Sequence, residues 1–275
     1  NAHGLRVQEL YGRPILNSFH GWWSIGAVCG GFIGSAARQA GIPVWVQCIA
    51  ATVVFGGMSL GAKTLLLPGL DHDPQAERSR QQRRRHLSAG TVVRLAALGL
   101  LGASAGLMED TGSTWGAIYL DRQFEVIPFV AGMAFVGLQG AQLIGRFTGD
   151  ALVSRIGPRP AVVQGGIIAF LGMGMSLIWP SPTTAILGFA CVGWGVATAI
   201  PSAMHAADEL PDMNYGDGLM IVTWMMRIGF FAGPPLIGAL SEAADLRLAL
   251  WVVPAFAVVI LVLSPSLGRS FGGRR

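Results

Sequence analysis

The sequence is dominated by long stretches that contain no charged residue. Residues 14–37, 43–62, 126–145 and 248–268 each lack Asp, Glu, Lys and Arg throughout. Each stretch is long enough to cross the hydrocarbon core of a bilayer, which takes about 20 helical residues, and a charged side chain there costs roughly 2.5–3.5 kcal/mol. Only 12% of the residues are charged, against about one quarter in soluble domains. The chain is therefore predicted to be an all-α polytopic membrane protein.

One uncharged stretch is too long for a single crossing. It covers 160–207 and is interrupted by Trp179-Pro180-Ser181-Pro182. Proline and serine favour a turn, so we expect two helices there. Two more spans, at about 92–118 and 217–241, contain isolated charges. The predicted total is about eight transmembrane helices.

The basic residues are distributed unevenly over the predicted loops. Eight crossings place both chain ends on one side, and the segments of that side hold 14 of the 19 Lys and Arg residues. Cytoplasmic loops carry the excess of positive charge, so we expect both ends in the cytoplasm. The longest polar stretch, 69–90, contains the Arg-rich run 78–85 and divides two spans from six. Because the flanking helices keep this run at the membrane, we expect it to bind anionic lipid headgroups rather than nucleic acid.

A short pattern occurs twice in the chain, once near each end. Ile25-Gly26-Ala27-Val28-Cys29-Gly30 resembles Ile228-Gly229-Phe230-Phe231-Ala232-Gly233. Such a wide spacing in a polytopic chain predicts two duplicated helical bundles. The first span then corresponds to the seventh, and about 110 residues with four further helices are expected upstream. The chain also begins with Asn1 rather than Met, as a fragment would.

Residues 145–159 join the fourth and fifth predicted spans. They read Gly-Arg-Phe-Thr-Gly-Asp-Ala-Leu-Val-Ser-Arg-Ile-Gly-Pro-Arg and resemble the cytoplasmic loop signature of the major facilitator superfamily. Ser154 stands where the commonest form has Asp. The resemblance implies a transporter of twelve helices in two bundles, with this segment as a gating loop. The residues that carry the signature are Gly145, Arg146, Gly149, Asp150, Arg155, Gly157 and Arg159.

Further residues resemble one branch of that family. They are Glu109-Asp110, Trp115, Tyr119-Leu120, Tyr11-Gly12-Arg13-Pro14 and Phe19-His20. Uncharacterised bacterial members related to fucose-type sugar permeases are similar here, which implies a location in the bacterial inner membrane. The resemblance also implies that 1–68 are the last two helices of an N-terminal bundle, 69–90 a basic cytoplasmic linker and 91–275 a C-terminal six-helix bundle. Sugar specificity does not follow from it.

Arg227 is the charge that we place deepest in a predicted span. The span starts near Asp217, so Arg227 lies about 15 Å along it at about 1.5 Å per residue. Trp224 precedes it by almost one turn, on the same helix face. An Arg beside a Trp can hold an anionic or hydroxyl-rich solute through bidentate bonds and stacking. The alternative is an ion pair with a neighbouring helix that serves structure alone.

Four more polar positions and one Trp complete the candidate site. Glu109 and Asp110 are expected in the external half of their span, with a role in proton coupling or external gating. We do not expect either acid to reach Arg227, since the depths differ by roughly 10 Å. Gln139 and Gln142 share a helix face with Arg146 and suit a polar solute, although such amides also bond helices together. Trp115 is expected to line the pathway or to pack.

The resemblance, together with these residues, implies a secondary active transporter of a small polar solute, sugar-like or an organic anion, that works by alternating access and is coupled to protons. We expect no enzymatic activity and no cofactor or metal, because the His and acidic residues do not cluster in sequence and no ATP-binding loop is present. The expected partners are the solute and membrane lipids, with a monomer as the full-length form. The alternative is a receptor-like or regulatory relative that binds without transport.

Overall fold

The computed structural model describes residues 7, 10, 11, 16–67, 87–211, 213 and 216–268, and along the first long helix it describes side chains from Trp22 onward. Within this part of the chain every regular element is a helix. The chain is an all-α polytopic membrane protein. In chain order the elements are α2 (Leu16–Gln39), α3 (Val44–Ala62), η1 (Lys63–Leu65), α5 (Ala89–Phe124), α6 (Pro128–Ile156), α7 (Pro158–Ile178), α8 (Pro182–Ala197), α9 (Ala199–Asp208), α10 (Asp217–Ala243), α11 (Leu246–Ala249), α12 (Val252–Leu263) and η2 (Ser264–Leu267).

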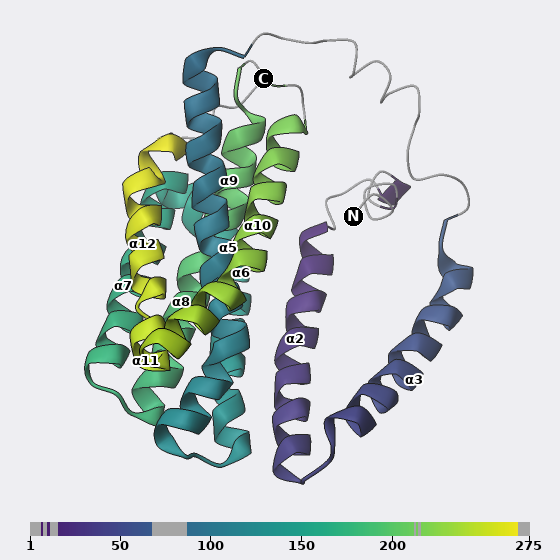
Figure 1. Cartoon of the computed structure of the whole chain (residues 1–275). Helices are drawn as coiled ribbons and strands as arrows, with labels where there is room; N and C mark the ends of the chain where they lie inside the picture. Colours follow the sequence, from purple (N-terminus) through teal and green to yellow (C-terminus); the bar gives the residue numbers. More distant parts are fainter. Residues whose placement is uncertain are drawn as a thin grey trace.

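Seven of the described helical segments are long and apolar enough to cross a membrane, where about eight were predicted. The first of the eight expected spans, α2, is not among them, although its 24 residues give it sufficient length. The reason lies in its composition, because α2 contains two Trp, Asn17 and His20 and is rich in glycine. α2 nevertheless runs alongside α6 in the structure (Figure 1).

The predicted turn between the two helices of the long uncharged stretch is confirmed. α7 ends at Ile178 and α8 begins at Pro182. Ser181 is the N-cap of α8, where its hydroxyl accepts a hydrogen bond from the Thr184 backbone N–H, and the Thr184 hydroxyl accepts from the Ser181 N–H. This reciprocal cap satisfies two N–H groups that the first helical turn leaves unpaired.

A second break in this part of the chain was not predicted. α8 ends at Ala197, and α9 starts at Ala199 after the single residue Thr198. Pro201 has no backbone N–H to donate to the carbonyl of Ala197, so the helical hydrogen-bond ladder is interrupted there. The two pieces together still form one membrane-crossing segment, Pro182–Asp208.

The helices from α5 to α12 enclose one continuous hydrophobic core. It extends from Leu95 on α5 to Leu267 on η2, and Leu98, Leu138 and Phe189 are among its fully buried side chains. α5 contacts α6, α8, α9, α10 and α12, so it is the central helix of the bundle. Figure 1 shows these helices side by side in one body.

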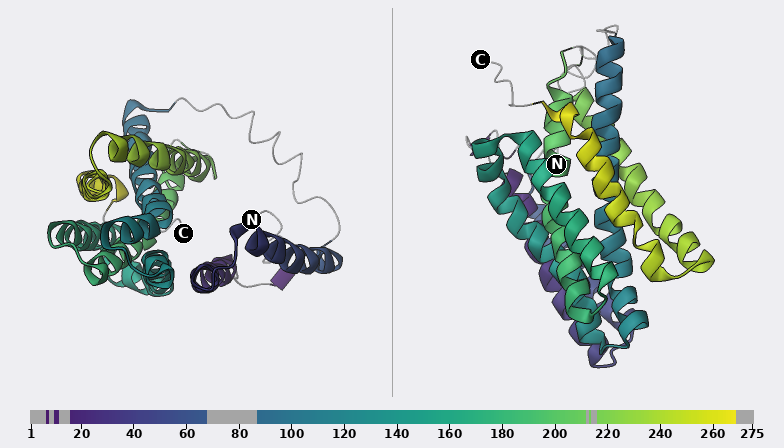
Figure 2. Two further views of the ribbon diagram at one scale, coloured as in Figure 1. Left: turned by 60° about the horizontal axis from the view of Figure 1, so that its bottom comes forward. Right: turned by 90° about the vertical axis from the view of Figure 1, so that its left-hand side faces the viewer.

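α2 and α3 lie beside this bundle and not within it (Figure 2). α2 packs along α6, where Gly31 faces Phe135 and Val136. None of the residues of α3 is buried. One face of α2 and almost all of α3 are therefore open in this structure.

Candidate functional site

An ion pair joins the middle of α5 to the middle of α6. The Arg146 Nη2 atom lies 3.8 Å from the Glu109 Oε1 atom, and the Glu109 side chain is only 8% exposed. α5 and α6 are antiparallel neighbours joined by a short turn after Phe124. Glu109 and Arg146 are separated from this turn by similar lengths of helix, one on each side. Because both helices rise at the same rate per residue, the two side chains reach a similar level.

Arg146 also connects these two helices to α2. Its Nη1 atom donates a hydrogen bond of 2.9 Å to the Ser24 hydroxyl, and its guanidinium carbon lies 5.5 Å from the centre of the Trp23 ring. The Arg146 side chain is 29% exposed and Trp23 is 57% exposed. A cation over an indole face is an attractive contact. Arg146 is thus held by three helices and remains accessible from the side of Trp23.

Two glutamines extend this polar site along α6. The Gln139 Nε2 atom donates to the Ser113 hydroxyl at 3.4 Å, and Ser113 donates to the carbonyl of Glu109 at 2.9 Å. Gln142 approaches the Glu109 carboxylate. The Gln139 Oε1 atom and both amide atoms of Gln142 are buried without a hydrogen-bond partner among the described residues. Buried polar atoms are nearly always paired, so these three atoms indicate a place for a ligand or for water.

We call Glu109, Ser113, Gln139, Gln142, Arg146, Ser24 and Trp23 the polar cluster. It includes Glu109, Gln139 and Gln142 from the sequence prediction. It also includes Arg146, which was predicted to belong to the gating loop, together with Ser113 of α5 and Ser24 and Trp23 of α2. The common level of the α5 and α6 residues, counted from the shared turn, is the sequence signal that was missed.

Asp110 and Trp115 face another helix. A methyl group built on Gly233 of α10 would lie 3.4 Å from the Asp110 Oδ2 atom, and one built on Gly238 would lie 3.7 Å from the Trp115 ring. The Asp110 Oδ2 and Trp115 Nε1 atoms are buried and have no hydrogen-bond partner among the described residues. The two adjacent acids therefore point to different neighbours, and Glu109 is the one that contacts the polar cluster.

Arg227 and Trp224 lie on the open face of α10. Both are exposed, Trp224 to 64%. α10 uses its other face, with Val222 and Gly229, to pack on α5. No hydrogen bond or ion pair joins Arg227 to the residues that the structure describes. The sequence prediction centred the site on Arg227, whereas the buried charged side chain among the described residues is Glu109, which pairs with Arg146.

The gating-loop prediction needs a correction in its local structure. Gly145, Arg146, Gly149, Asp150 and Arg155 all belong to α6, which continues to Ile156. The turn itself is Gly157, with φ of +89°, and Arg159 already lies in α7. Helix formation persists because the segment contains no Pro before Pro158. Gly145 and Gly149 serve close packing instead, because added methyl groups would meet Ala197 and Thr198 at 2.6 and 3.0 Å.

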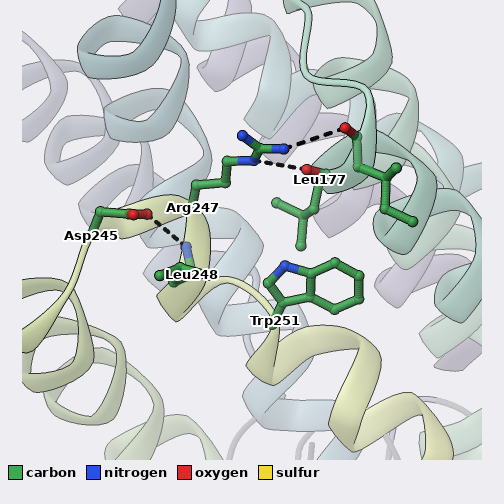
Figure 3. A pocket seen from close by; sticks show the side chains of 6 residues that line it. Leu177, Asp245, Arg247, Leu248 and Trp251 are labelled. Atoms are coloured by element: carbon green, nitrogen blue, oxygen red, sulfur yellow. Dashed lines mark hydrogen bonds between the residues drawn. The ribbon is translucent and has the colours of Figure 1, made fainter.

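A shallow cavity of about 450 Å³ lies at the turn between α7 and α8, away from the polar cluster (Figure 3). Arg247 donates hydrogen bonds to the carbonyls of Leu177 and Ile178 at 2.7 and 3.3 Å. Asp245 accepts from the backbone N–H of Leu248 at the start of α11. A cation at the C-terminal end of α7 and an acid at an N-cap both stabilise helix ends. The charges of this cavity are therefore used to join α11 to α7.

The described residues contain no group of three or more His, Cys, Asp or Glu side chains that could hold a metal ion. The polar cluster has a single acid, Glu109, and its remaining members are amides, hydroxyls, an Arg and a Trp. Such a set suits hydrogen bonding and charge pairing with an organic solute. The side chain of His20, which contributes to the family resemblance, lies outside the described part of α2.

Known proteins resemble this chain over most of its length. An uncharacterized transporter of Sinorhizobium fredii is 30% identical over 272 residues, which cover 97% of this chain and 69% of that protein. The membrane protein MosC of Rhizobium meliloti is 29% identical over 66% of this chain and 44% of its own length. An uncharacterized MFS-type transporter of Yersinia pestis is 26% identical over 97% of this chain and 66% of its own length. The chain thus spans between about two fifths and two thirds of these relatives, and no solved structure matches it.

The match to a protein family covers most of α5 and all of α6, the two helices that contribute most residues to the polar cluster. Residues 98–268 match the Major Facilitator Superfamily and include Glu109, Gln139, Gln142 and Arg146. This region is more than half of the 275 residues. The chain belongs to the Major Facilitator Superfamily of membrane transporters.

Proposed function

We propose that this protein is a secondary active transporter that moves a small polar solute by alternating access, and that the polar cluster binds the solute. Its family and its relatives support a membrane transporter. The proposal assigns solute contacts to Arg146, Gln139 and Gln142, and proton coupling to Glu109. The relation to fucose-type permeases stays a prediction, because these relatives are known as uncharacterized transporters and no sugar is assigned to them.

The observation that carries the proposal is the combination of a partly buried ion pair with unpartnered amide atoms inside membrane-crossing helices. Glu109 and Gln142 are 6% and 1% exposed, and both amide atoms of Gln142 lack a partner among the described residues. Each buried polar atom without a partner costs about 1–3 kcal/mol. A purely structural cluster would satisfy these atoms, as Ser181 and Thr184 do in the cap of α8. A cluster that binds solute leaves them free until the solute arrives.

We further propose that α2 and α3 belong to a first bundle, whose remaining helices cover the open faces of α2, α3 and α10. The greater length of the relatives supports this arrangement. The repeated glycine pattern supports it too. Gly229 packs on Ala103 of α5, whereas nothing lies within 4 Å of a methyl group built on Gly26. Gly26 and Gly229 are equivalent positions of the repeated pattern. We therefore expect the face of α2 that contains Gly26 to pack on the helix of the first bundle that corresponds to α5.

In this arrangement Arg227 and Trp224 face the first bundle and line the α10 side of the pathway. Asp110 remains a second candidate for proton coupling, and the turn at Gly157 forms the cytoplasmic hinge between α6 and α7. The excess of basic residues supports cytoplasmic chain ends in the bacterial inner membrane. The proposed full-length form is a monomer.

Uptake into proteoliposomes tests the proposal. The complete product of the gene is reconstituted and screened for counterflow of labelled sugars, polyols, amines and organic acids. We expect one class to be taken up, and we expect Arg146→Gln to abolish this uptake. Glu242→Gln, a change of an exposed acid at the end of α10, is the control that retains it. Ligand binding without counterflow favours the receptor-like alternative, and unaffected uptake by Arg146→Gln removes the polar cluster from the pathway.

A further inference from the structure

The geometry of the Glu109–Arg146 pair points to the chemical class of the solute and to its stoichiometry with protons. We propose that the solute is a polyhydroxylated monocarboxylate that travels with one proton. Its carboxylate replaces that of Glu109 on Arg146, and Glu109 is protonated in the same step. This inference rests on the proposed function, since it assumes that the polar cluster is the solute site.

The internal pair is loose enough for a solute to compete with it. The Arg146–Glu109 separation of 3.8 Å exceeds the length of a charge-assisted hydrogen bond, about 2.7–2.9 Å. Among the described residues, Arg146 donates one hydrogen bond, from its Nη1 atom to the Ser24 hydroxyl. A guanidinium has five N–H donors in a planar fork that matches a carboxylate bidentately. A free carboxylate that approaches from the exposed Trp23 side can therefore bind Arg146 in a better geometry than Glu109 does.

Charge balance then requires the proton. With the solute bound, Arg146 faces two carboxylates, and the cluster would carry one uncompensated negative charge within the membrane-crossing helices. Such a charge is costly, and protonation of the displaced Glu109 removes it. The balance is Arg146⁺·Glu109⁻ plus solute⁻ plus H⁺ giving Arg146⁺·solute⁻ plus neutral Glu109. One O–H bond forms on Glu109, the proton comes from the water on the side from which the solute enters, and no net charge moves.

Besides Arg146, the described charge that acts on Glu109 is its neighbour Asp110, and Arg227 of α10 lies exposed on the open face of that helix. α8 and α12 contain no charged residue. Asp110 is turned towards α10, and Arg38 of α2 pairs with Asp121 at the far ends of their helices. His205 of α9 pairs with Glu209. Arg146 is thus the one described cation that compensates either Glu109 or the solute.

The amide and hydroxyl groups of the cluster favour hydroxyl groups on the rest of the solute. Gln139 offers a free acceptor, and Gln142 offers a free acceptor and a free donor. A hydroxyl group can both donate and accept, so a polyol chain can satisfy all three atoms. An alkyl chain would leave them buried and unpaired, which costs affinity.

Calorimetric titration with three matched probes tests the inference. Gluconate has the proposed chemistry, sorbitol is its neutral analogue and glucamine its cationic analogue. The complete gene product is titrated at one pH in two buffers of different ionisation enthalpy, which reports the protons taken up on binding. We expect gluconate to bind at least about tenfold tighter than sorbitol, since hydrogen bonds to charged groups contribute about 1.5–3 kcal/mol. We expect about one proton taken up per gluconate bound, and the weakest binding for glucamine.

Glu109→Gln mimics the protonated acid and provides the decisive comparison. It is expected to bind gluconate at least as tightly as the unchanged protein and without proton uptake, whereas Glu242→Gln retains the proton uptake. Ser24→Ala keeps both charges, removes one Arg146 contact and is expected to weaken gluconate binding several-fold, about what one hydrogen bond contributes. It serves as a second test if Glu109→Gln folds poorly, which its elution from a sizing column reveals.

Equal binding of sorbitol, tightest binding of glucamine, or proton uptake that persists in Glu109→Gln would each overturn the inference. So would the absence of binding by all three probes. The proposed function stands in these cases if another solute is taken up in an Arg146-dependent manner. It fails separately if no solute class shows uptake in the counterflow screen.

Discussion

Two ion pairs of the structure, one exposed and one partly buried, allow the effect of burial on the coupling free energy of a charge pair to be measured. The Arg38 Nη2 and Asp121 Oδ2 atoms are 3.4 Å apart, with side chains 58% and 42% exposed. The Arg146 and Glu109 atoms are farther apart, at 3.8 Å, but their side chains are only 29% and 8% exposed. Distance alone makes the Arg38 pair the stronger one. Burial predicts the reverse order.

The magnitudes follow from the environment of each pair. At 3.8 Å and an effective dielectric constant of about 20, two unit charges attract by about 4 kcal/mol before desolvation is subtracted. The partial exposure of Arg146 reduces this value, so we expect a coupling free energy of at least about 1.5 kcal/mol for Glu109 and Arg146. Exposed pairs contribute about 0.2–1 kcal/mol, and we expect Arg38 and Asp121 to couple by less than about 0.5 kcal/mol.

Two double-mutant cycles measure these values in the same protein. One cycle combines Glu109→Gln with Arg146→Gln, and the other combines Asp121→Asn with Arg38→Gln. Thermal unfolding in detergent is the assay, and about 2–4 °C per kcal/mol for a chain of this length converts the expected coupling into roughly 3–6 °C. A coupling for Arg38 and Asp121 that equals or exceeds that of Glu109 and Arg146 would refute the reasoning from burial.

Three further predictions concern the fold and the open face of α10, and each is checked by thermal unfolding. Gly165→Ala is expected to destabilise the protein by about 1–3 kcal/mol, because the new methyl group would lie 2.6 Å from the carbonyl oxygen of Gly195, whereas Gly140→Ala meets nothing within 4 Å and should not destabilise it. Equal effects of the two changes would contradict the close packing of α7 on α8. Ser181→Ala is expected to cost about 1 kcal/mol through loss of the cap of α8, and an unchanged unfolding temperature would argue against that cap. Arg227→Gln is expected to alter the unfolding free energy by less than about 0.5 kcal/mol, and a larger loss would reveal a structural partner.

The fold class and several helix boundaries were predictable because they depend on local chemistry. Charged residues are costly in a bilayer, so the uncharged stretches mark the spans. The Trp179–Pro182 turn was predicted because two prolines and a serine lie close together there, and proline interrupts the helical hydrogen-bond ladder. The break at Thr198 follows from the same property of Pro201, and it was missed because the surrounding sequence remains uncharged and apolar.

The sequence predicted several residues of the site, but it did not predict which residues of neighbouring helices they contact. Gln139, Gln142 and Arg146 were recognised as one helix face, yet the face alone does not say which neighbouring helix it meets. Counting from residue 92 placed Glu109 in the external half of its span, and this position stays a prediction. What was missed is that α5 continues to Phe124, next to the turn into α6, so Glu109 lies level with Arg146.

The contact with α2 could not be predicted from the spacing of residues. Ser24 and Arg146 are 122 residues apart in the chain, and which faces of α2 and α6 meet depends on the shapes of side chains such as Phe135 against Gly31. Loop charge and span length contain no information on that rotation. Arg227 was placed at the centre of the site for the same reason. The depth of a residue in a span can be counted from the sequence, whereas the direction in which its side chain points depends on how the helix is rotated.

The central claim is that solute binds at Arg146 between α2, α5 and α6, and the most direct measurement is an experimental structure of the complete gene product with a transported solute bound. We expect the solute to lie within hydrogen-bond distance of Arg146 and Gln142 beside Trp23, with Glu109 displaced from Arg146. A solute bound elsewhere, such as on Arg227 and Trp224, with the Glu109–Arg146 pair intact, would contradict it.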